Sequence, residues 1–261
     1  MQQVKPKKAL GQHFLTDERV AKRISETLDS YNDTPVLEVG PGMGVLTKYL
    51  IESHEQLKVV EIDGESVEYL REHYPGLKVI ESDFLEMDLS TVFGAEEKIC
   101  VIGNYPYNIS SQIFFKVLDY KDSVVCCSGM LQKEVAERIA AGPGSKVYGI
   151  LSVLLQAWYE VEYLFTVEAE VFNPPPKVKS GVIRLIRNDV TDLGCDERQF
   201  KKVVKTSFGQ RRKMLRSSLK GMFPPGAEEL GSELFTKRPE QLNVQEFVEI
   251  TNMVTKYRNQ E

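Results

Sequence analysis

The segment from Pro35 to Thr47 reads P-V-L-E-V-G-P-G-M-G-V-L-T and decides the fold. Its first part, Val36 to Val39, is a short and mostly apolar run of the kind that forms a buried strand in a parallel sheet. Three glycines then follow at alternate positions, Gly40, Gly42 and Gly44. Glycine accepts a positive φ and has no Cβ, so a ligand can come close to the backbone of such a turn. The segment therefore predicts a strand, a tight glycine turn and the start of a helix.

Two interpretations of this turn are open: a glycine-rich connection that binds nothing, or a nucleotide-type cofactor site at the carboxyl end of the first strand. A dinucleotide-binding fingerprint requires G-x-G-x-x-G, and here Val45 occupies its sixth position. The pattern E-x-G-x-G-x-G, which begins at Glu38, instead resembles motif I of the S-adenosylmethionine-dependent methyltransferases. That resemblance implies a turn that passes beneath the amino-acid and ribose portions of the cofactor.

The chain as a whole has an ordinary globular composition, with 261 residues, 42% of them apolar and 27% charged. This length suits one large α/β domain with a small appendage. No apolar run approaches the roughly 18 residues of a membrane span, and the basic N-terminus lacks the apolar core of a signal peptide. We therefore expect a cytoplasmic protein with no membrane partner and no metal cluster, whose free thiols are Cys100, Cys126, Cys127 and Cys195.

The net charge of −5 argues against a surface that binds nucleic acid everywhere, but the basic residues are unevenly distributed. Residues 201–220 contain eight Lys or Arg residues and no acid, and the N-terminal segment adds Lys5, Lys7 and Lys8. Two interpretations stay open, a footprint that binds phosphates and a solvated helix face.

Two further predicted strands, 57–63 and 77–81, end near carboxylates. Glu61 falls about 20 residues after the glycine turn, where a carboxylate in a Rossmann-like sheet accepts hydrogen bonds from the ribose hydroxyls. The alternative for Glu61 is a solvated strand end. Asp83 lies just past the next strand and can accept from the exocyclic amine of adenine, and Phe84 or Met43 can pack on the purine face.

The predicted strand 99–102 runs directly into Asn104-Tyr105-Pro106-Tyr107. Amino-methyltransferases carry [D/N/S]-P-P-[Y/F] or N-[L/I]-P-[Y/F] at this strand end, and the sequence fits with a tyrosine in the second place. An exocyclic aromatic amine is a poor nucleophile, because its lone pair is delocalised. The side-chain carbonyl of Asn104 and the main-chain carbonyl of Tyr105 can accept from that amine, while an extruded base stacks on Tyr107. We expect catalysis by positioning and electrostatics without a strong base; the alternative is a plain proline turn.

Residues 160–168 and 181–187 predict an antiparallel hairpin that closes the sheet. The intervening loop from Phe172 to Ser180 contains three prolines and is therefore stiff. We expect it to hold Phe172 beside Tyr107, so that the two rings clamp a base from both sides.

An apolar helix over 149–159 is expected in the core of the first domain, and residues 188–195 form a linker. Beyond it, four segments predict helices that Gly and Pro interrupt: 197–207, 211–220, 227–234 and 244–258. We therefore expect a catalytic, cofactor-binding domain over residues 1–188, including the basic N-terminal arm. Residues 189–261 are expected to form a small, basic, RNA-binding helical domain.

Eight motifs, in this order, resemble the KsgA-type ribosomal RNA adenine dimethyltransferases over roughly residues 5–250: K-x-x-G-Q-H-F-L, E-V-G-P-G-M-G-V-L-T, V-E-I-D, S-D-F-L, N-Y-P-Y-N-I-S, Q-K-E-V-A-E-R, F-N-P-P-P-K-V-K-S and F-G-Q-R-R-K-M-L. The resemblance implies a Rossmann-like class I methyltransferase fold, α/β with a seven-stranded, mostly parallel sheet and a small C-terminal helical domain. It also implies transfer of four methyl groups from S-adenosyl-L-methionine to N6 of two adjacent adenosines. These lie in a hairpin loop near the 3′ end of small-subunit rRNA. The implied partner is a precursor of the 30S subunit, which the protein meets as a monomer.

The resemblance also places functional residues on this chain. The implied cofactor contacts are His13, Leu15, Gly40, Glu61, Asp83 and Asn104, and to these we add Gly42, Gly44, Ile62 and Phe84. The predicted catalytic and base-binding residues are Asn104, Tyr105, Pro106, Tyr107 and Phe172. The predicted RNA-binding residues are Lys5, Lys7, Lys8, Lys133, Arg138, Lys177, Lys179, Arg211, Arg212, Lys213 and Arg216. Two positions depart from the family pattern: His13 replaces the common Asn, and Tyr105 replaces the usual Leu, which leaves the shape of the base pocket open.

Three rival functions are compatible with parts of the sequence. The nearest is the Erm-type large-subunit rRNA methyltransferase, but F-G-Q-R-R-K, P-P-P-K-V-K-S and R-P-E-Q-L look more like the KsgA type. The second is a ribosome-assembly or transcription factor that keeps the fold without catalysis, against which the intact N-Y-P-Y motif and Glu61 argue. A nicotinamide dehydrogenase is disfavoured by Val45 and by the lack of a histidine at a strand end.

Overall fold

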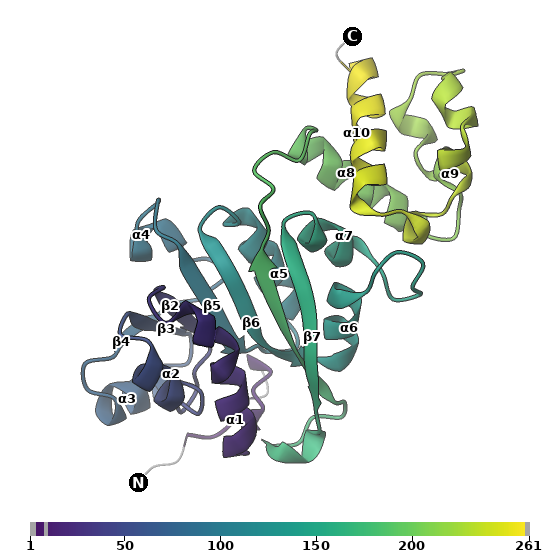
Figure 1. Cartoon of the computed structure of the whole chain (residues 1–261). Coiled ribbons are helices and arrows are strands. Elements are labelled where there is room, and N and C mark those ends of the chain that lie inside the picture. The colour runs from purple at the N-terminus through teal and green to yellow at the C-terminus, as the bar shows by residue number, and fades with distance from the viewer. Residues whose placement is uncertain (1–3, 8–9, 259–261) are drawn as a thin grey trace. The chain divides into compact units, whose positions relative to one another are not determined.

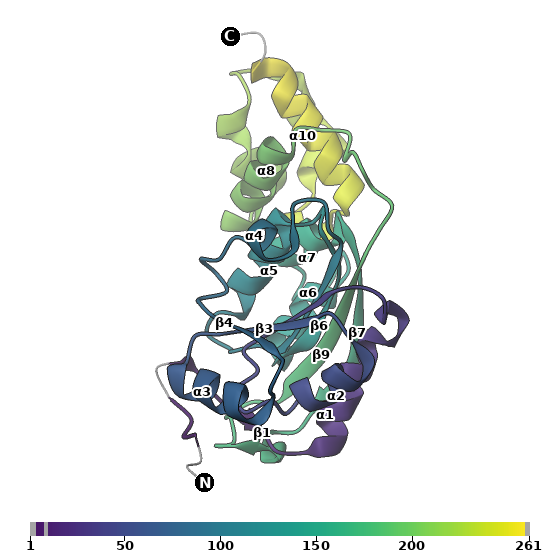
Figure 2. The ribbon, with the colours of Figure 1, turned by 90° about the vertical axis from the view of Figure 1, so that its left-hand side faces the viewer.

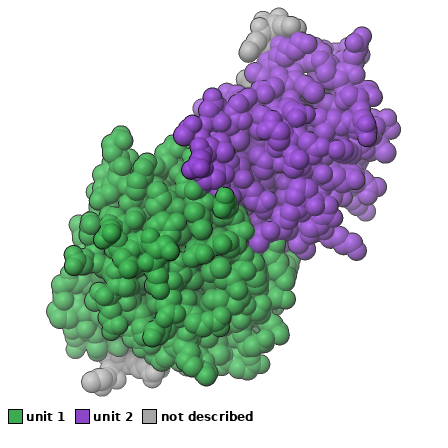
Figure 3. Space-filling view, viewed as in Figure 1, with its two compact units in different colours: residues 1–137, 160–187 green, residues 138–159, 188–261 purple. Residues whose placement is uncertain are grey.

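The computed structural model describes residues 4–7 and 10–258, and only the backbone of residue 258. It divides into two compact units. Unit 1 comprises residues up to 137 together with 160–187, and unit 2 comprises 138–159 together with 188–261 (Figure 3). The boundary after residue 187 lies at the start of the segment 188–195 that the sequence predicts as a linker, and residues 138–159 belong to unit 2.

Unit 1 is built on a seven-stranded sheet with the order β4-β3-β2-β5-β6-β9-β7 (Figure 1). The strands are β2 (Val36–Val39), β3 (Leu57–Glu61), β4 (Lys78–Glu81), β5 (Ile99–Asn104), β6 (Val124–Gln132), β7 (Tyr159–Val167) and β9 (Ser180–Arg187). Strands β2 to β6 pair in parallel, and β9 pairs antiparallel with β6. The predicted α/β fold with a mostly parallel seven-stranded sheet is therefore confirmed.

Helices alternate with these strands. They are α1 (Glu18–Ser25), the 3-10 helix η2 (Glu26–Tyr31), α2 (Thr47–Ser53), α3 (Gly64–His73), α4 (Leu89–Phe93), α5 (Ser110–Asp119) and α6 (Lys133–Ala140). The Asp17 carboxylate accepts from the Arg19 and Val20 amides and so caps the start of α1. Helices α1 and α2 lie side by side in both ribbon views (Figures 1 and 2).

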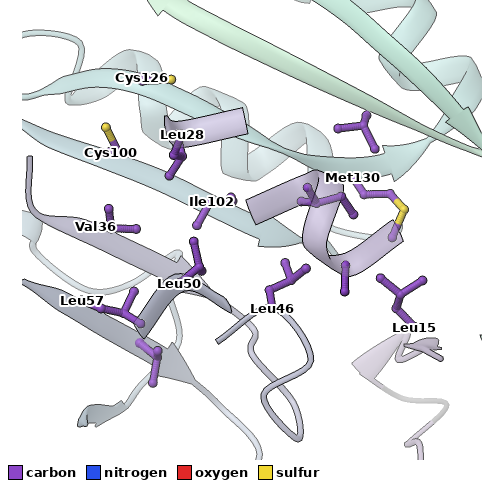
Figure 4. Close-up of a cluster of buried hydrophobic side chains, with 14 of the residues drawn as sticks. Leu15, Leu28, Val36, Leu46, Leu50, Leu57, Cys100, Ile102, Cys126 and Met130 are labelled. Carbon is purple, nitrogen blue, oxygen red and sulfur yellow. The ribbon is translucent and has the colours of Figure 1, made fainter. Parts of the chain in front are cut away.

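A hydrophobic cluster fills the space between these first helices and one face of the sheet (Figure 4). In β5, Cys100 and Ile102 belong to the cluster, while Val101 between them is buried but lies outside it. Successive strand residues point to opposite faces, so both faces of β5 are covered. Strand β5 is thus packed on both faces, and it ends at the carboxyl edge of the sheet.

The glycine turn after β2 has the backbone that its sequence predicts. Gly40, Gly42 and Gly44 have φ values of 66°, 55° and 83°. A Cβ on Gly44 would lie 2.7 Å from the ring of Tyr74, so this glycine allows close packing as well as a positive φ.

Unit 2 is mainly helical: α7 (Ile150–Gln156), α8 (Glu197–Gly209), α9 (Leu215–Ser218) and α10 (Val244–Arg258), with short 3-10 helices at Lys220–Met222, Glu228–Gly231, Glu233–Thr236 and Pro239–Gln241. Helix α7 packs against α8 and α10, because its apolar side chains find their partners there. Phe208 stacks with Phe247 at 6.0 Å between ring centroids. Within the predicted helix 211–220 the α-helical part is α9, and the predicted helix 227–234 is formed mainly by 3-10 segments.

None of the helices in the described part of the chain is long and apolar enough to cross a bilayer.

Candidate active site

A cavity of about 280 Å³ opens in unit 1 where β2, β3, β4 and β5 end. Five segments supply its walls: 10–15 of the N-terminal arm, most of 38–46 around the glycine turn, 60–62, 82–85 and 104–109. Ligands of open α/β sheets bind outside the carboxyl ends of the strands. The cavity therefore lies where such a sheet presents a cofactor site.

Glu61 joins two walls of the cavity. Its Oε2 accepts from the Gly42 amide at 3.0 Å, and its Oε1 accepts from the Ile62 and Asp63 amides at 2.9 Å each. The side chain is 4% exposed, and burial raises its pKa. A carboxylate has about four acceptor positions, so one remains for a ligand hydroxyl. Glu61 fixes the glycine turn to the end of β3 and still faces the cavity.

Glu38 is a second buried carboxyl in the cavity wall. The Thr47 hydroxyl donates to its Oε2 at 2.6 Å, and burial raises its pKa to about 8. Glu38 enters the sequence-based prediction only as the first letter of E-x-G-x-G-x-G and is not among the predicted site residues. Its sequence signal is that motif position, a carboxylate on an otherwise apolar buried strand.

Asn104 ends β5, and its amide is oriented by the N-terminal arm. Its Nδ2 donates to the His13 carbonyl at 3.2 Å, which leaves Oδ1 as an acceptor. The His13 Nδ1 donates to the Pro174 carbonyl at 2.8 Å. Three segments far apart in the sequence therefore meet at the N-Y-P-Y turn.

Tyr107 is half-buried in this turn, and its hydroxyl lies 2.5 Å from the hydroxyl of the buried Ser180. Burial raises the pKa of Tyr107. On its other side, the His13 ring stacks at 5.5 Å between ring centroids with an interplanar angle of 29°. Tyr107 is thus an oriented aromatic surface at the cavity.

The sequence model of the family described as Ribosomal RNA adenine dimethylase matches residues 3–256 of this chain. The chain belongs to the ribosomal RNA adenine dimethylase family.

Individual relatives agree with this assignment. A protein of Parabacteroides distasonis is 63% identical over 259 residues, which cover 98% of this chain and 97% of that relative. A protein of Porphyromonas gingivalis is 59% identical over 253 residues, which cover 96% and 98%. Both are named ribosomal RNA small subunit methyltransferase A.

Two solved structures have the same fold over most of their lengths. A dimethyladenosine transferase from Plasmodium falciparum superposes with a TM-score of 0.78 at 23% identity, covering 94% of this chain and 98% of the other. The 23S rRNA methyltransferase ErmE superposes with a TM-score of 0.69 at 28% identity, covering 92% and 99%. The predicted family, its S-adenosylmethionine-dependent methyltransferase fold and its rRNA adenine dimethyltransferase class are confirmed.

The cavity of this dimethylase-family chain fits S-adenosylmethionine. Glu61 keeps an acceptor position for a ribose hydroxyl, and open space lies where a side chain on Gly40 would be. The apolar side chains of Ile62, which is 52% exposed, and Phe84 offer surfaces for a purine. His13, Leu15, Asp83 and Asn104, which the sequence predicts as cofactor contacts, also line the cavity. Gly44 is absent from its walls and serves packing.

Tyr105 occupies the second motif position without narrowing the site. Its ring is 1% exposed, its hydroxyl donates to the Ser128 carbonyl at 2.7 Å, and burial raises its pKa. A Cβ on Gly129 would lie 2.6 Å from this ring, so Gly129 makes the room that a tyrosine needs here. The Tyr105 ring, which stands where the family pattern has leucine, is therefore accommodated by packing beneath the turn.

Phe172 does not take its predicted place. It is 3% exposed in the hydrophobic cluster, and it does not line the cavity. The cause is a two-stranded pairing of β1 (Phe14–Leu15) with β8 (Phe172–Asn173), which sets Leu15 opposite Phe172. The expected clamp of Phe172 and Tyr107 is not formed, and His13 lies beside Tyr107 instead.

The predicted RNA-binding residues fall into three groups. Lys7 pairs with Asp63 and Glu65, Lys133 with Glu137, and Lys179 with Glu168. Arg211 donates to the Lys146 carbonyl at 2.5 Å, and Arg138 also has interaction partners. Lys8 lies outside the described residues. Lys5, Lys177, Arg212, Lys213 and Arg216 are exposed, and so is Lys179 despite its ion pair.

Proposed function

We propose that this protein transfers methyl groups from S-adenosylmethionine to N6 of two adjacent adenosines in the 3′-terminal hairpin loop of small-subunit rRNA. The observation that carries the proposal is the orientation of Asn104, whose Nδ2 is engaged by His13 so that Oδ1 is left to accept from an amine. The names of relatives at 55–63% identity support the small subunit as the substrate.

When bound, the cofactor supplies an electrophilic methyl group. The residues of the chain hold and orient the reactants around it. Glu61 accepts from a ribose hydroxyl, and the Asn104 Oδ1 accepts from the target amine. The hydrogen bond draws the nitrogen lone pair out of conjugation and aims it at the cavity, while Tyr107 supports the base. The amine proton becomes acidic once the nitrogen is alkylated, so no strong base is required.

The exposed basic residues of unit 2 support a role for residues 189–261 in binding RNA phosphates. We further propose that the protein acts as a monomer in the cytoplasm on a precursor of the 30S subunit. Residues 138–159 belong to the same compact unit, so we assign them to the RNA-binding part of the chain as well.

A methyl-transfer assay with labelled S-adenosylmethionine tests the proposal on both ribosomal subunits in parallel, each prepared without the relevant modification. We expect label only in the small-subunit rRNA. Label in large-subunit RNA would establish the Erm-type function. If neither RNA is labelled and the protein still binds the small subunit, a non-catalytic assembly factor is the better account.

A further inference from the structure

Lys116 on α5 lies behind the loop that follows β4. Its Nζ donates to the Leu85 carbonyl at 3.0 Å and also to the Met87 carbonyl. The same ammonium group lies 5.5 Å from the ring centroid of Phe84. Burial lowers the pKa of Lys116, while Asp83 and Asp88 act in the opposite direction. A partly buried lysine therefore contacts the loop at three points.

The inner side of this loop faces the cavity, because Ser82, Asp83, Phe84 and Leu85 line it. Asp83 orders the loop from within: its Oδ1 accepts from the Leu85 amide at 2.8 Å, and its carbonyl accepts from the Glu86 and Met87 amides at 3.1 Å each. These bonds satisfy amides and leave the carbonyls of Leu85 and Met87 to another donor. Lys116 is that donor, and it does not line the cavity.

We propose that Lys116 is a positioning residue that sets the adenine end of the cofactor cavity by holding the loop of Asp83 to Met87. The inference rests on the proposed binding of S-adenosylmethionine in this cavity. Hydrogen bonds from a charged donor are stronger than neutral ones, and two of them on one short loop fix where Phe84 and Asp83 present their side chains. Removing the ammonium therefore weakens binding of the purine end without touching the methyl-transfer residues.

Lys58 provides a matched control. Its Nζ donates to the Val92 carbonyl at 2.7 Å and lies 4.1 Å from the ring centroid of Phe93. Burial lowers its pKa too. The contacts are of the same kind, yet neither Val92 nor Phe93 lines the cavity. A purely structural role for Lys116 predicts that the two lysines behave alike.

The experiment is calorimetric binding of S-adenosylhomocysteine and of adenosine to the wild type, Lys116→Met, Lys116→Arg and Lys58→Met. Thermal unfolding of each protein verifies that it is folded. We expect Lys116→Met to raise the Kd of both ligands about tenfold. Lys116→Arg should recover part of the affinity, and Lys58→Met should leave both Kd values unchanged. At saturating cofactor, kcat of Lys116→Met should stay near that of the wild type, while its KM for S-adenosylmethionine rises.

Should Lys116→Met fail to fold, Lys116→Gln keeps an uncharged NH2 donor and is expected to show an intermediate loss of affinity. An unchanged adenosine Kd in the folded Lys116 variants, or an equal loss in Lys58→Met, would overturn the inference alone. If the wild type bound neither ligand, the proposed cofactor would be wrong as well, and the inference with it.

Discussion

The hydroxyl groups of Tyr107 and Ser180 lie 2.5 Å apart, one at the N-Y-P-Y turn and the other at the start of β9. Ser180 is fully buried, whereas Tyr107 is half-buried at the cavity. The bond ties the aromatic surface of the site to a strand inside the sheet, so the ring orientation is set by the fold. The stacked His13 ring supports the same orientation from the arm.

Removing this bond should slow methyl transfer. We expect Ser180→Ala and Tyr107→Phe each to lower kcat about fivefold, since a net hydrogen bond contributes about 1 kcal/mol and sets the ring position. The Kd of S-adenosylhomocysteine should not change. Because both substitutions remove the same bond, the double variant should be no slower than the worse single one. Additive losses would show that the two residues act independently.

Asn104→Ala should lower kcat by about 10²–10³, because it removes a positioned acceptor at the reacting amine. The cofactor Kd should change by much less, and comparing single-turnover rates with calorimetric affinities measures both. Asn104→Asp serves as the companion variant: it keeps an acceptor but loses the donor to the His13 carbonyl, so it should also be slow. Full turnover by Asn104→Ala would remove Asn104 from the mechanism.

Glu38 should make the free energy of unfolding fall as the pH rises. Its pKa is about 8 in the folded protein and near 4.5 in the unfolded chain. Between pH 4.5 and pH 8 the folded state therefore holds a proton that the unfolded chain has lost. Stability therefore falls as pH rises through this range. Glu38→Gln should flatten this dependence and be more stable than the wild type at about pH 8.5, by about 1–3 kcal/mol.

The measurement is denaturant unfolding of the ligand-free protein at about pH 6 and at about pH 8.5. The two free energies of unfolding show how far stability falls as the pH rises. The exposed Glu72→Gln on α3 is the control, and its pH dependence should match the wild type. A Glu38→Gln curve parallel to that of the wild type would mean that Glu38 is ionised in the folded protein.

The basic residues to remove from unit 2 are Arg212, Lys213 and Arg216, because Arg211 is engaged with the Lys146 carbonyl. Their triple alanine variant should bind small-subunit rRNA more weakly and with a flatter dependence on salt. The slope of log K against log salt should fall by about 0.7–0.9 for each phosphate that the variant no longer neutralises. The exposed Lys22, Arg71 and Lys78 of unit 1 form a control triple. Equal slopes for the two triples would mean that the basic residues of 201–220 form only a solvated face.

Much of the fold could be predicted because its signals are local. The apolar run Val36–Val39 predicts a buried strand, and the alternate glycines predict a tight turn because they accept a positive φ. Asn104 to Tyr107 could be placed for the same reason, since a parallel strand delivers its next residues to the edge where ligands bind.

The remaining features depend on pairings between distant segments. The pairing of Leu15 with Phe172 buries the expected base clamp, and the pairing of Lys7 with Asp63 engages a lysine expected to be free. Helix α7 is apolar, as predicted, but its sequence does not say that its partners are α8 and α10. The role of Lys116 could not be predicted from the sequence, because a lysine that donates to two carbonyls looks there like any other lysine of a helix.

The most direct test of the proposed activity is nucleoside analysis of small-subunit rRNA after reaction with the wild type and with Asn104→Ala, using subunits that lack the modification. We predict N6,N6-dimethyladenosine at two adjacent positions of the 3′-terminal hairpin loop with the wild type, and almost none with the variant. Dimethyladenosine elsewhere, or equal amounts from both proteins, would contradict the proposed activity.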